Sequence, residues 1–350
     1  MTAAAPLVSV VVPCFNLGQY LHEAVDSVLS QTVDSYEILV GDDGSTDEDT
    51  RRVLETFSKP HTRLLRYPHR GLAATRNALI SEARGMYVCA LDADDVLHVA
   101  FLERTLAAFE ADPALTFVST HLQMFGVEAR VWPQTDRCDL AALLVDDTVI
   151  TAALVKREAV LLIGGYDTRM PAQGDEDWDL WISLVEAGHR GRILPEVLFF
   201  YRRRHGSMLD ACTSGPTHLA LVRYIVSKHE AAYRAHLPEV LRDKEQEAGA
   251  LRRANVALER ETADLKALVS RRRSELEGLR QRLQRLQRAA VPGAATSNGP
   301  AGDDLRRELL ALDSEYRRAL QEIRDLRGST SWTLTRPLRA GYDFLRRLRS

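Results

Sequence analysis

Three aspartates at the end of one apolar run are the residues of this chain best suited to do chemistry. The run 86–91 is typical of a buried strand, and Asp92, Asp94 and Asp95 follow it directly. Carboxylates this close repel one another unless a cation or hydrogen-bond donors compensate them, so the spacing favours a site for a hard divalent metal. The structural alternative is an Asp-rich turn in which Asp95 caps a helix beginning near Leu97.

A second group of carboxylates lies in the first turn of a predicted helix. Its members are Asp175, Glu176, Asp177 and Asp179. The helix is indicated by the spacing of Leu180, Trp181 and Leu184. Acidic side chains stabilise a helix N-terminus through the helix dipole, so capping alone is one interpretation of the group. Trp178 and Trp181 offer flat apolar faces that a ligand could pack on, although we expect Trp181 in the core.

Polar residues also end two earlier apolar runs. Asn16 follows the run 7–12, and Asp42 and Asp43 follow the run 36–41. Apolar runs alternate with helical spacing along this part of the chain, which predicts a doubly wound α/β sheet. In such sheets ligands bind at the carboxyl ends of the strands, and all these polar residues are expected there.

The pattern also gives approximate element positions. The expected strands are 7–16, 36–41, 64–67, 86–91, 115–121 and 193–201. The expected helices lie at 21–29, from 47, from 69, at 98–112, near 180–185 and at 216–235. Residues 126–150 show no clear period and are assigned no detailed structure.

Five short motifs occur in an order that resembles the inverting glycosyltransferases of family 2. They are VVPCFN (11–16), DDGSTD (42–47), RGLAATRN (70–77), LDADD (91–95) and EDWDLW (176–181). Each motif alone is weak, but the ordered series is specific and spans about residues 7–210. The resemblance implies the GT-A fold, a Rossmann-like domain that binds a nucleotide sugar.

The resemblance also implies roles for the first carboxylate group. Asp92-Ala-Asp94 matches the metal-binding DxD motif, in which Asp94 would bind Mn or Mg and Asp92 would approach the donor ribose. Asp42 or Asp43 would hydrogen-bond the nucleobase, and Arg76 would lie near the diphosphate. The residues expected to bind the donor are Pro13, Phe15, Asn16, Asp42, Asp43, Arg76 and Asp92.

Two alternatives stay open for these donor residues. Residues 42–47 can form only a turn and a helix cap, and Arg76 can lie on the surface of an amphipathic helix. The sequence also departs from the family at His69, where relatives more often carry Asn, so no contact is assigned to His69.

The catalytic role falls on the second carboxylate group. By the same resemblance Asp177 is the catalytic base, with Glu176 and Asp175 as fallbacks, and Glu176 and Trp178 are assigned to acceptor binding. The base would remove the proton of the acceptor hydroxyl as that oxygen attacks the anomeric carbon. A single direct displacement inverts the configuration of that carbon.

A basic stretch after the last expected strand bears on the metal and the diphosphate. His205 follows Tyr201 after three arginines, one residue more than the spacing common in the family. The resemblance makes His205 a further metal ligand. Arg203 and Arg204 could instead hold the diphosphate, and a solvated basic loop is the structural alternative.

Composition limits the class and the compartment. The chain has 350 residues, 45% of them hydrophobic, which suffices for a sizeable core and two structural units. Cys14, Cys89, Cys138 and Cys212 show no metal-binding spacing and are typical of a reducing compartment. No signal peptide or membrane-spanning run is evident. We therefore expect a cytoplasmic protein, peripheral at the inner face of the plasma membrane, without a nucleic-acid partner.

The C-terminal third has a different pattern. A heptad phase from Leu241 to Leu286 predicts a left-handed coiled coil and a homo-oligomer, with Asn255 at an a position favouring two strands. A long solvated helix is the alternative. Residues 1–240 carry 22 basic and 33 acidic side chains, whereas 329–350 carry five and one. The basic segment is therefore expected to contact either anionic lipid or a partner protein.

The expected domain organisation follows from these patterns. It comprises a GT-A catalytic domain at 1–238, a coiled coil at 239–290, a flexible linker at 291–303, a second short coiled-coil helix at 304–328 and a basic amphipathic segment at 329–350. Residues 328–339 are similar to an element at the ends of bacterial surface-polysaccharide glycosyltransferases.

We therefore expect a metal-dependent glycosyltransferase of bacterial surface polysaccharide biosynthesis. Its partners would be a nucleoside-diphosphate sugar and a glycan or lipid-linked acceptor. One alternative is a catalytically decayed coiled-coil scaffold protein of the same pathway, against which the intact carboxylates speak. Another is a nucleotidyltransferase, which should carry a Gly-rich basic loop after the first strand, whereas 15–18 contains no basic residue.

Overall fold

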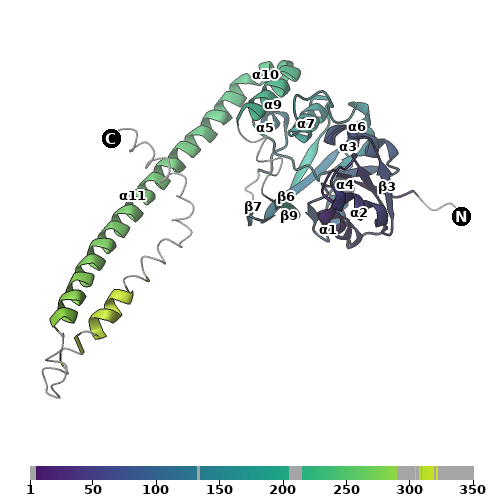
Figure 1. Ribbon diagram of the computed structural model, residues 1–350. Coiled ribbons are helices and arrows are strands. Elements are labelled where there is room, and N and C mark those ends of the chain that lie inside the picture. The colour runs from purple at the N-terminus through teal and green to yellow at the C-terminus, as the bar shows by residue number, and fades with distance from the viewer. Residues whose placement is uncertain are drawn as a thin grey trace. The chain divides into compact units, whose positions relative to one another are not determined.

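The computed structural model describes residues 5–131, 135–204, 215–289, 304, 307–308, 310–318 and 321 (Figure 1). The chain forms two compact units, Met1–Lys244 and Glu245–Ser350. His205, Cys212 and the segments predicted at 291–303 and 329–350 lie outside the described residues, as do several positions of the helix predicted at 304–328. In the described part of the chain, no helix has the length and apolar character to cross a membrane.

A mixed sheet organises the first unit. Its nine strands within the described ranges follow the order β3-β2-β1-β4-β8-β6-β9-β5, and β7 pairs with β6. The strands are β1 Val8–Cys14, β2 Tyr36–Asp42, β3 Thr62–Arg66, β4 Tyr87–Ala90, β5 Val96–Leu97, β6 Phe117–Gly126, β7 Arg130–Val131, β8 Leu154–Lys156 and β9 Gly191–Arg203. Strands β1 to β4 pair in parallel, β8 is antiparallel to β4 and β6, and β9 is parallel to β6.

Helices cover both faces of this sheet (Figure 1). They are α1 Gly18–Leu29, α2 Glu48–Thr56, α3 Leu72–Glu82, α4 Phe101–Ala111, α5 Leu140–Leu143, α6 Arg157–Leu162, α7 Glu176–Glu186, α9 Gly215–Lys228 and α10 Glu230–Ala235. In β1, Val10 and Val12 pack with α1, α2 and α4, while Val11 packs with α3, α6 and α7. Both faces of β1 are therefore buried, which explains its unbroken apolar sequence.

The α/β class predicted from the sequence is confirmed, but several boundaries differ. The helix expected at 98–112 begins at Phe101, because Val96 and Leu97 pair with β9 as strand β5. The helix expected at 216–235 is divided into α9 and α10 at His229. The unassigned region 126–150 contains β7 and α5, two elements too short to produce a period.

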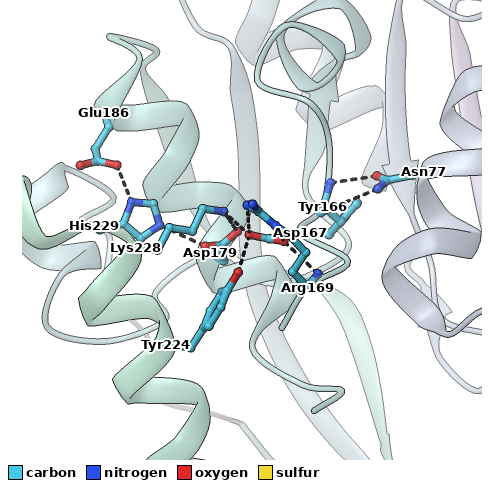
Figure 2. Close-up of polar contacts among 9 residues, drawn as sticks. All are labelled: Asn77, Tyr166, Asp167, Arg169, Asp179, Glu186, Tyr224, Lys228 and His229. Carbon is cyan, nitrogen blue, oxygen red and sulfur yellow. Dashed lines mark hydrogen bonds and ion pairs between the residues drawn. The ribbon is translucent and has the colours of Figure 1, made fainter. Parts of the chain in front are cut away.

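A polar network joins α7 to α9 in the first unit (Figure 2). We call it the α7–α9 clasp, and it consists of Asp167, Asp179, Glu186, Tyr224, Lys228 and His229. Lys228 Nζ lies 2.7 Å from Asp179 and 2.9 Å from Asp167. The His229 ring lies 3.0 Å from Asp179 and also contacts Glu186. The backbone breaks at His229 while its ring is held by two carboxylates of α7.

The second unit is helical where the structure describes it. Helix α11, Leu237–Ala289, carries the whole heptad pattern predicted from the sequence and continues from the first unit into the second. Residues 310–318 are also helical, and Arg282 pairs with Glu308 at 3.0 Å. Val269 and Leu312 are buried within this unit. Pairing of α11 with a second chain stays a prediction.

Candidate active site

The carboxyl ends of the central strands open onto a cavity of about 600 Å³. Both carboxylate groups singled out in the sequence line it. From the first group come Asp92 and Asp94, and from the second come Asp175, Glu176 and Asp177. The two groups are more than 80 residues apart in the sequence, so the fold rather than local structure brings them together.

Arg76 links the two carboxylate groups directly. Its Nη2 donates to Asp92 at 2.6 Å, and its Nη1 donates to Glu176 at 2.7 Å. The side chain is only 1% exposed, which rules out the surface position considered for it. Burial opposes the charge of this guanidinium, but Asp92 and Glu176 raise its pKa above the ordinary value, so Arg76 stays a cation. Its Nε has no hydrogen-bond partner in the described structure.

Asp94 combines a cavity position with a basic neighbour. Burial and the nearby Asp92 raise the pKa of Asp94, although Arg204 opposes the change. Arg204 Nε donates to Asp94 Oδ2 at 2.7 Å, so the structure places this arginine against the predicted metal ligand. Arg203 instead lies 3.6 Å from Glu128.

Asp95 has a different role from the helix cap considered for it. It is buried and accepts the backbone N–H of Arg202 at 2.7 Å, which ties the DxD loop to β9. Burial and the neighbouring Asp94 raise the pKa of Asp95 well above its ordinary value. Helix α4 begins farther on, after Ala100. The cap interpretation was therefore wrong, because the partner of Asp95 lies on a distant strand.

Asp43 and Phe15 form one wall of the cavity with His69. The Asp43 carboxylate accepts from the backbone of Arg70 and from Thr75 Oγ1, and it pairs with His69 at 2.9 Å. The His69 ring stacks on Phe15 with centroids 4.3 Å apart. Pro13 also lines this wall. His69, to which the sequence assigned no contact, therefore extends the aromatic surface of Phe15.

Asn16 and Asp42 organise the loop behind that wall. The Asn16 side chain accepts from the backbone N–H groups of Thr46 and Asp47, and Asp42 accepts from Ser45. Neither belongs to the described lining of the cavity. The turn and cap interpretation holds locally, since Asp47 caps α2. A donor contact for Asn16 or Asp42 stays a prediction.

Asp177 faces the cavity from the first turn of α7. Its Oδ1 accepts the backbone N–H of Trp178 at 3.0 Å, and its Oδ2 accepts the hydroxyl of Thr151. Trp178 is mostly buried and donates its Nε1–H to the Leu143 carbonyl, but it still lines the cavity. Trp181 is in the core, as expected, where it packs on Phe117.

Glu176 and Asp175 differ from Asp177 in their surroundings. Both oxygens of Glu176 are engaged, one by Arg76 and the other by the backbone N–H of Gly174 at 2.8 Å. Asp175 has a left-handed backbone, with φ of 58°. Burial and the neighbouring Asp177 raise the pKa of Asp175 to about 6. Glu176 is thus held in a fixed pair, whereas the pKa of Asp175 is raised well above its ordinary value.

Four lining residues could not be found by the sequence motifs. They are Asp146, Asp147, Thr151 and His218. The first three lie in or beside the segment that showed no period, and His218 lies on α9, beyond the last motif. Only their position in the fold identifies them.

The residues present fit a divalent cation bound with a diphosphate. In the described ranges, no cluster of three or more His, Cys, Asp or Glu side chains forms a complete metal site. Asp92 and Asp94 nevertheless present hard oxygen ligands to the cavity. A cation such as Mg²⁺ commonly takes one or two carboxylates and completes its shell with phosphate oxygens and water. Asp94 is therefore a suitable ligand for a cation that arrives with its nucleotide.

Comparisons with known proteins agree with this geometry. The family model Glycosyl transferase family 2 matches residues 9–161, which include the DxD motif. The chain is 30% identical over 221 residues to the putative teichuronic acid biosynthesis glycosyltransferase TuaG of Bacillus subtilis (strain 168), covering 59% of this chain and 83% of that protein. It is 29% identical over 190 residues to a chondroitin synthase of Pasteurella multocida (strain Pm70), covering 52% of this chain. The chain spans only 19% of the length of that synthase.

A solved structure supports the fold. The structure of S. aureus TarS 1-349 in complex with UDP-GlcNAc matches with a TM-score of 0.53 at 18% identity, covering 66% of this chain and 72% of that one. At this identity the match concerns the fold, which is of the GT-A type. Taken with the family model and the extent of the match to TuaG, the comparisons show that the chain belongs to glycosyl transferase family 2.

Proposed function

We propose that the protein is a metal-dependent, inverting glycosyltransferase that transfers a sugar from a nucleoside diphosphate to an acceptor hydroxyl. The observation that carries the proposal is the convergence of Asp92, Asp94 and Asp177 on one cavity, with Arg76 linking the DxD motif to the helix of the base. Family membership supports the same reaction class.

The donor would occupy the side of the cavity formed by β1 and α3. The stacked rings of Phe15 and His69 offer an apolar surface to a nucleobase, and Asp43 lies beside them. Asp92 would approach the ribose. Arg204, which now pairs with Asp94, lies where it could turn to the diphosphate. The UDP-GlcNAc complex of TarS supports a nucleotide sugar as the class of donor.

The metal would be held by Asp94, with His205 as a further proposed ligand. A bound Mn²⁺ or Mg²⁺ would supply Lewis-acid stabilisation of the negative charge that develops on the leaving diphosphate. Arg76 would keep Asp92 and Glu176 in place, since a buried guanidinium with two short hydrogen bonds has little freedom to move.

Asp177 would act as the general base. Its carboxylate would take the proton of the acceptor hydroxyl while that oxygen forms a bond to the anomeric carbon. The bond from this carbon to the diphosphate breaks on the opposite face, and its electron pair leaves with the diphosphate. Trp178 would pack on the acceptor, and Glu176 would contribute mainly by orienting the turn that carries Asp177, because both its oxygens are engaged.

The proposed pathway and assembly extend beyond the cavity. The names of the relatives support a glycan acceptor in bacterial polysaccharide synthesis. A lipid-linked acceptor and a position at the inner face of the plasma membrane are proposed from the sequence alone. Self-association through α11 is supported by Leu241 and Leu251, which are 60% and 64% exposed on a helix with heptad spacing. Membrane contact by 329–350 is proposed from the basic, amphipathic sequence alone.

A binding and turnover screen tests the function. The full chain is mixed with nucleoside diphosphates with and without Mn²⁺ or Mg²⁺, and the melting temperature is recorded. Nucleotide sugars that protect the protein are then tested for metal-dependent hydrolysis and for transfer to glycan acceptors. We expect protection and turnover that chelation with EDTA abolishes. Absence of both with every nucleotide would favour the decayed-scaffold alternative.

A further inference from the structure

We propose that Thr151 is a positioning residue for Asp177. Its hydroxyl would fix the orientation of the base carboxylate toward the acceptor. The proposal rests on the proposed function, in which Asp177 is the base. Thr151 belongs to no recognised motif, and its role follows from the geometry of the loop before β8.

The two donors that reach Asp177 fix the plane of its carboxylate. Thr151 donates to Oδ2 and the backbone N–H of Trp178 donates to Oδ1. An ionised carboxylate can only accept, so the threonine hydroxyl must be the donor in this state. With one donor on each oxygen, rotation of the carboxylate would break at least one hydrogen bond. Thr151 and Asp177 both line the cavity, where an acceptor hydroxyl can reach them.

The loop that carries Thr151 is anchored on both sides of the sheet. Val149 and Ile150 are buried in the two separate core clusters, and Ala152 and Ala153 are buried after them. The N–H of Ala153 also closes a turn onto the Ile150 carbonyl at 3.2 Å. The four neighbours of Thr151 in sequence therefore cannot move without exposing apolar surface, which makes its hydroxyl a fixed donor.

The charges around Asp177 explain why a fixed donor is needed. The charged or titratable side chains nearest Asp177 come from several elements. They are Asp146 and Asp147 from the loop before β8, Asp175 and Glu176 from α7, Arg76 from α3, Tyr166 from the loop after α6, and His218 from α9. Arg76 carries a positive charge, but both of its Nη groups already donate hydrogen bonds to other carboxylates, Asp92 and Glu176. Neighbouring carboxylates favour the protonated form of an acid, whereas a hydrogen bond to the anion favours ionisation.

The role predicts a specific kinetic change. Without the hydroxyl, the Asp177 carboxylate would lose one of its two hydrogen bonds and would sample orientations that do not face the acceptor. We expect Thr151→Val to lower kcat about 10- to 100-fold, the range expected for a hydrogen bond to a charged group. The acidic limb of the pH–rate profile should move upward by roughly one unit. Donor affinity should be unchanged.

The experiment compares three variants of the full chain with the wild type. Thr151→Val removes the hydroxyl at nearly constant volume, and Thr151→Ser restores it. Thr148→Val is the matched control in the same loop, because the buried Thr148 hydroxyl has no partner in the described structure and does not line the cavity. Each variant is measured for transfer across pH, for protection by Mn²⁺ and nucleoside diphosphate, and for melting temperature.

The outcomes separate the positioning role from the proposed function. Loss of rate with a displaced acidic limb in Thr151→Val, recovery in Thr151→Ser and wild-type behaviour in Thr148→Val support the role. Wild-type rate or an unmoved limb in Thr151→Val overturns it, as does failure of Thr151→Ser to recover. If the wild type itself shows no transfer and no metal-dependent nucleotide binding, the proposed function is what has failed.

Discussion

Helix α7 carries two aspartates, two residues apart, in contrasting surroundings. Asp179 belongs to the α7–α9 clasp, is 1% exposed and faces Lys228 and His229, which are cationic or can become so (Figure 2). Asp177 faces the cavity, where its carboxylate accepts hydrogen bonds from a hydroxyl and a backbone N–H. Helix α7 therefore carries one carboxylate, Asp179, that is paired with basic side chains, and another, Asp177, that is held by hydrogen bonds from uncharged donors.

The pKa directions of neighbouring groups follow the same division. In the clasp, burial would raise the pKa of Asp167, but Arg169 and Lys228 reverse the effect and hold it far below its usual range. In the cavity, burial and Asp177 raise the pKa of Asp175 to about 6. Asp167 and Asp179 of the clasp are paired with cations, whereas Asp175 in the cavity lies beside another carboxylate. Substitutions of Asp177 in the cavity and of Asp179 in the clasp test this difference.

The largest expected effect is on turnover, from Asp177→Asn. The amide keeps the shape but cannot accept a proton, so transfer should fall by about 10²- to 10⁴-fold, the usual contribution of general-base catalysis. The melting temperature and donor binding should be retained, because crowding of carboxylates is relieved and no cation loses its partner. Transfer assays and thermal melts measure both. Near-normal transfer would show that another group is the base.

The matched change on the same helix is Asp179→Asn, which should affect stability instead. It removes the anion that Lys228 and His229 share, while Asp167 and Glu186 still contact them, so the lost charge-assisted hydrogen bonds should cost about 2 kcal/mol. The melting temperature should fall by roughly 4–8 °C for a unit of this size. Below the melting range, kcat should remain within a few-fold of wild type. A larger catalytic than structural effect would contradict the division proposed between the two aspartates.

Asp94→Ala should affect the donor rather than the base. Removal of the predicted metal ligand should weaken metal-dependent protection by a nucleoside diphosphate by about 10- to 100-fold, comparable with loss of one charge-assisted ligand. Burial and Asp92 disfavour the charge of Asp94, and its partner Arg204 is partly exposed to water, so the apo protein should lose little stability. Titrations monitored by thermal shift, with and without Mn²⁺, measure the effect. Unchanged metal dependence would exclude Asp94 as a ligand.

The smallest expected effect is the pH dependence of the clasp. Burial lowers the pKa of His229, but hydrogen bonds to Asp179 and Glu186 outweigh it, so the net direction is upward. A folded-state pKa above the ordinary value of about 6.5 means that the stabilisation is complete below that pH. It is lost as the pH rises through the folded-state pKa.

A melting series tests this sign. Between pH 6 and pH 9 the wild type should lose more stability than His229→Gln, because the variant has no imidazolium to lose. Parallel curves for the two proteins would show that His229 does not contribute charge to the clasp.

The sequence could predict a residue's position when its neighbours in the chain decide that position, and not when a hydrogen-bond partner far away in the sequence decides it. The sequence could predict that one cavity is lined by Asp92, Asp94 and Asp177, because each lies in a contiguous motif at the end of an element. The α/β class could be predicted from apolar periodicity. The surface alternative for Arg76 failed because its partner Glu176 is 100 residues away. Asp95 was open to a wrong interpretation for the same reason, since its partner belongs to β9.

Other features had no signal in the sequence at all. Thr151 is one hydroxyl in a segment without periodicity, and only the approach of its loop to α7 gives it a partner. The break at His229 was hidden because α9 and α10 follow a single helical pattern, and the carboxylates that hold the ring come from another helix. Long-range hydrogen bonds of this kind leave no trace in local composition.

The shortness of α7 has a mechanical consequence. Its eleven residues extend only about 16 Å and bend little over that length. His229, which follows α9, contacts α7 both at its last residue, Glu186, and in its first turn, at Asp179. A displacement of α9 should therefore move the whole of α7, including Asp177, the proposed base. Substitutions that loosen the contact between α9 and α7 should therefore change turnover by no more than a few-fold, without touching the substrate.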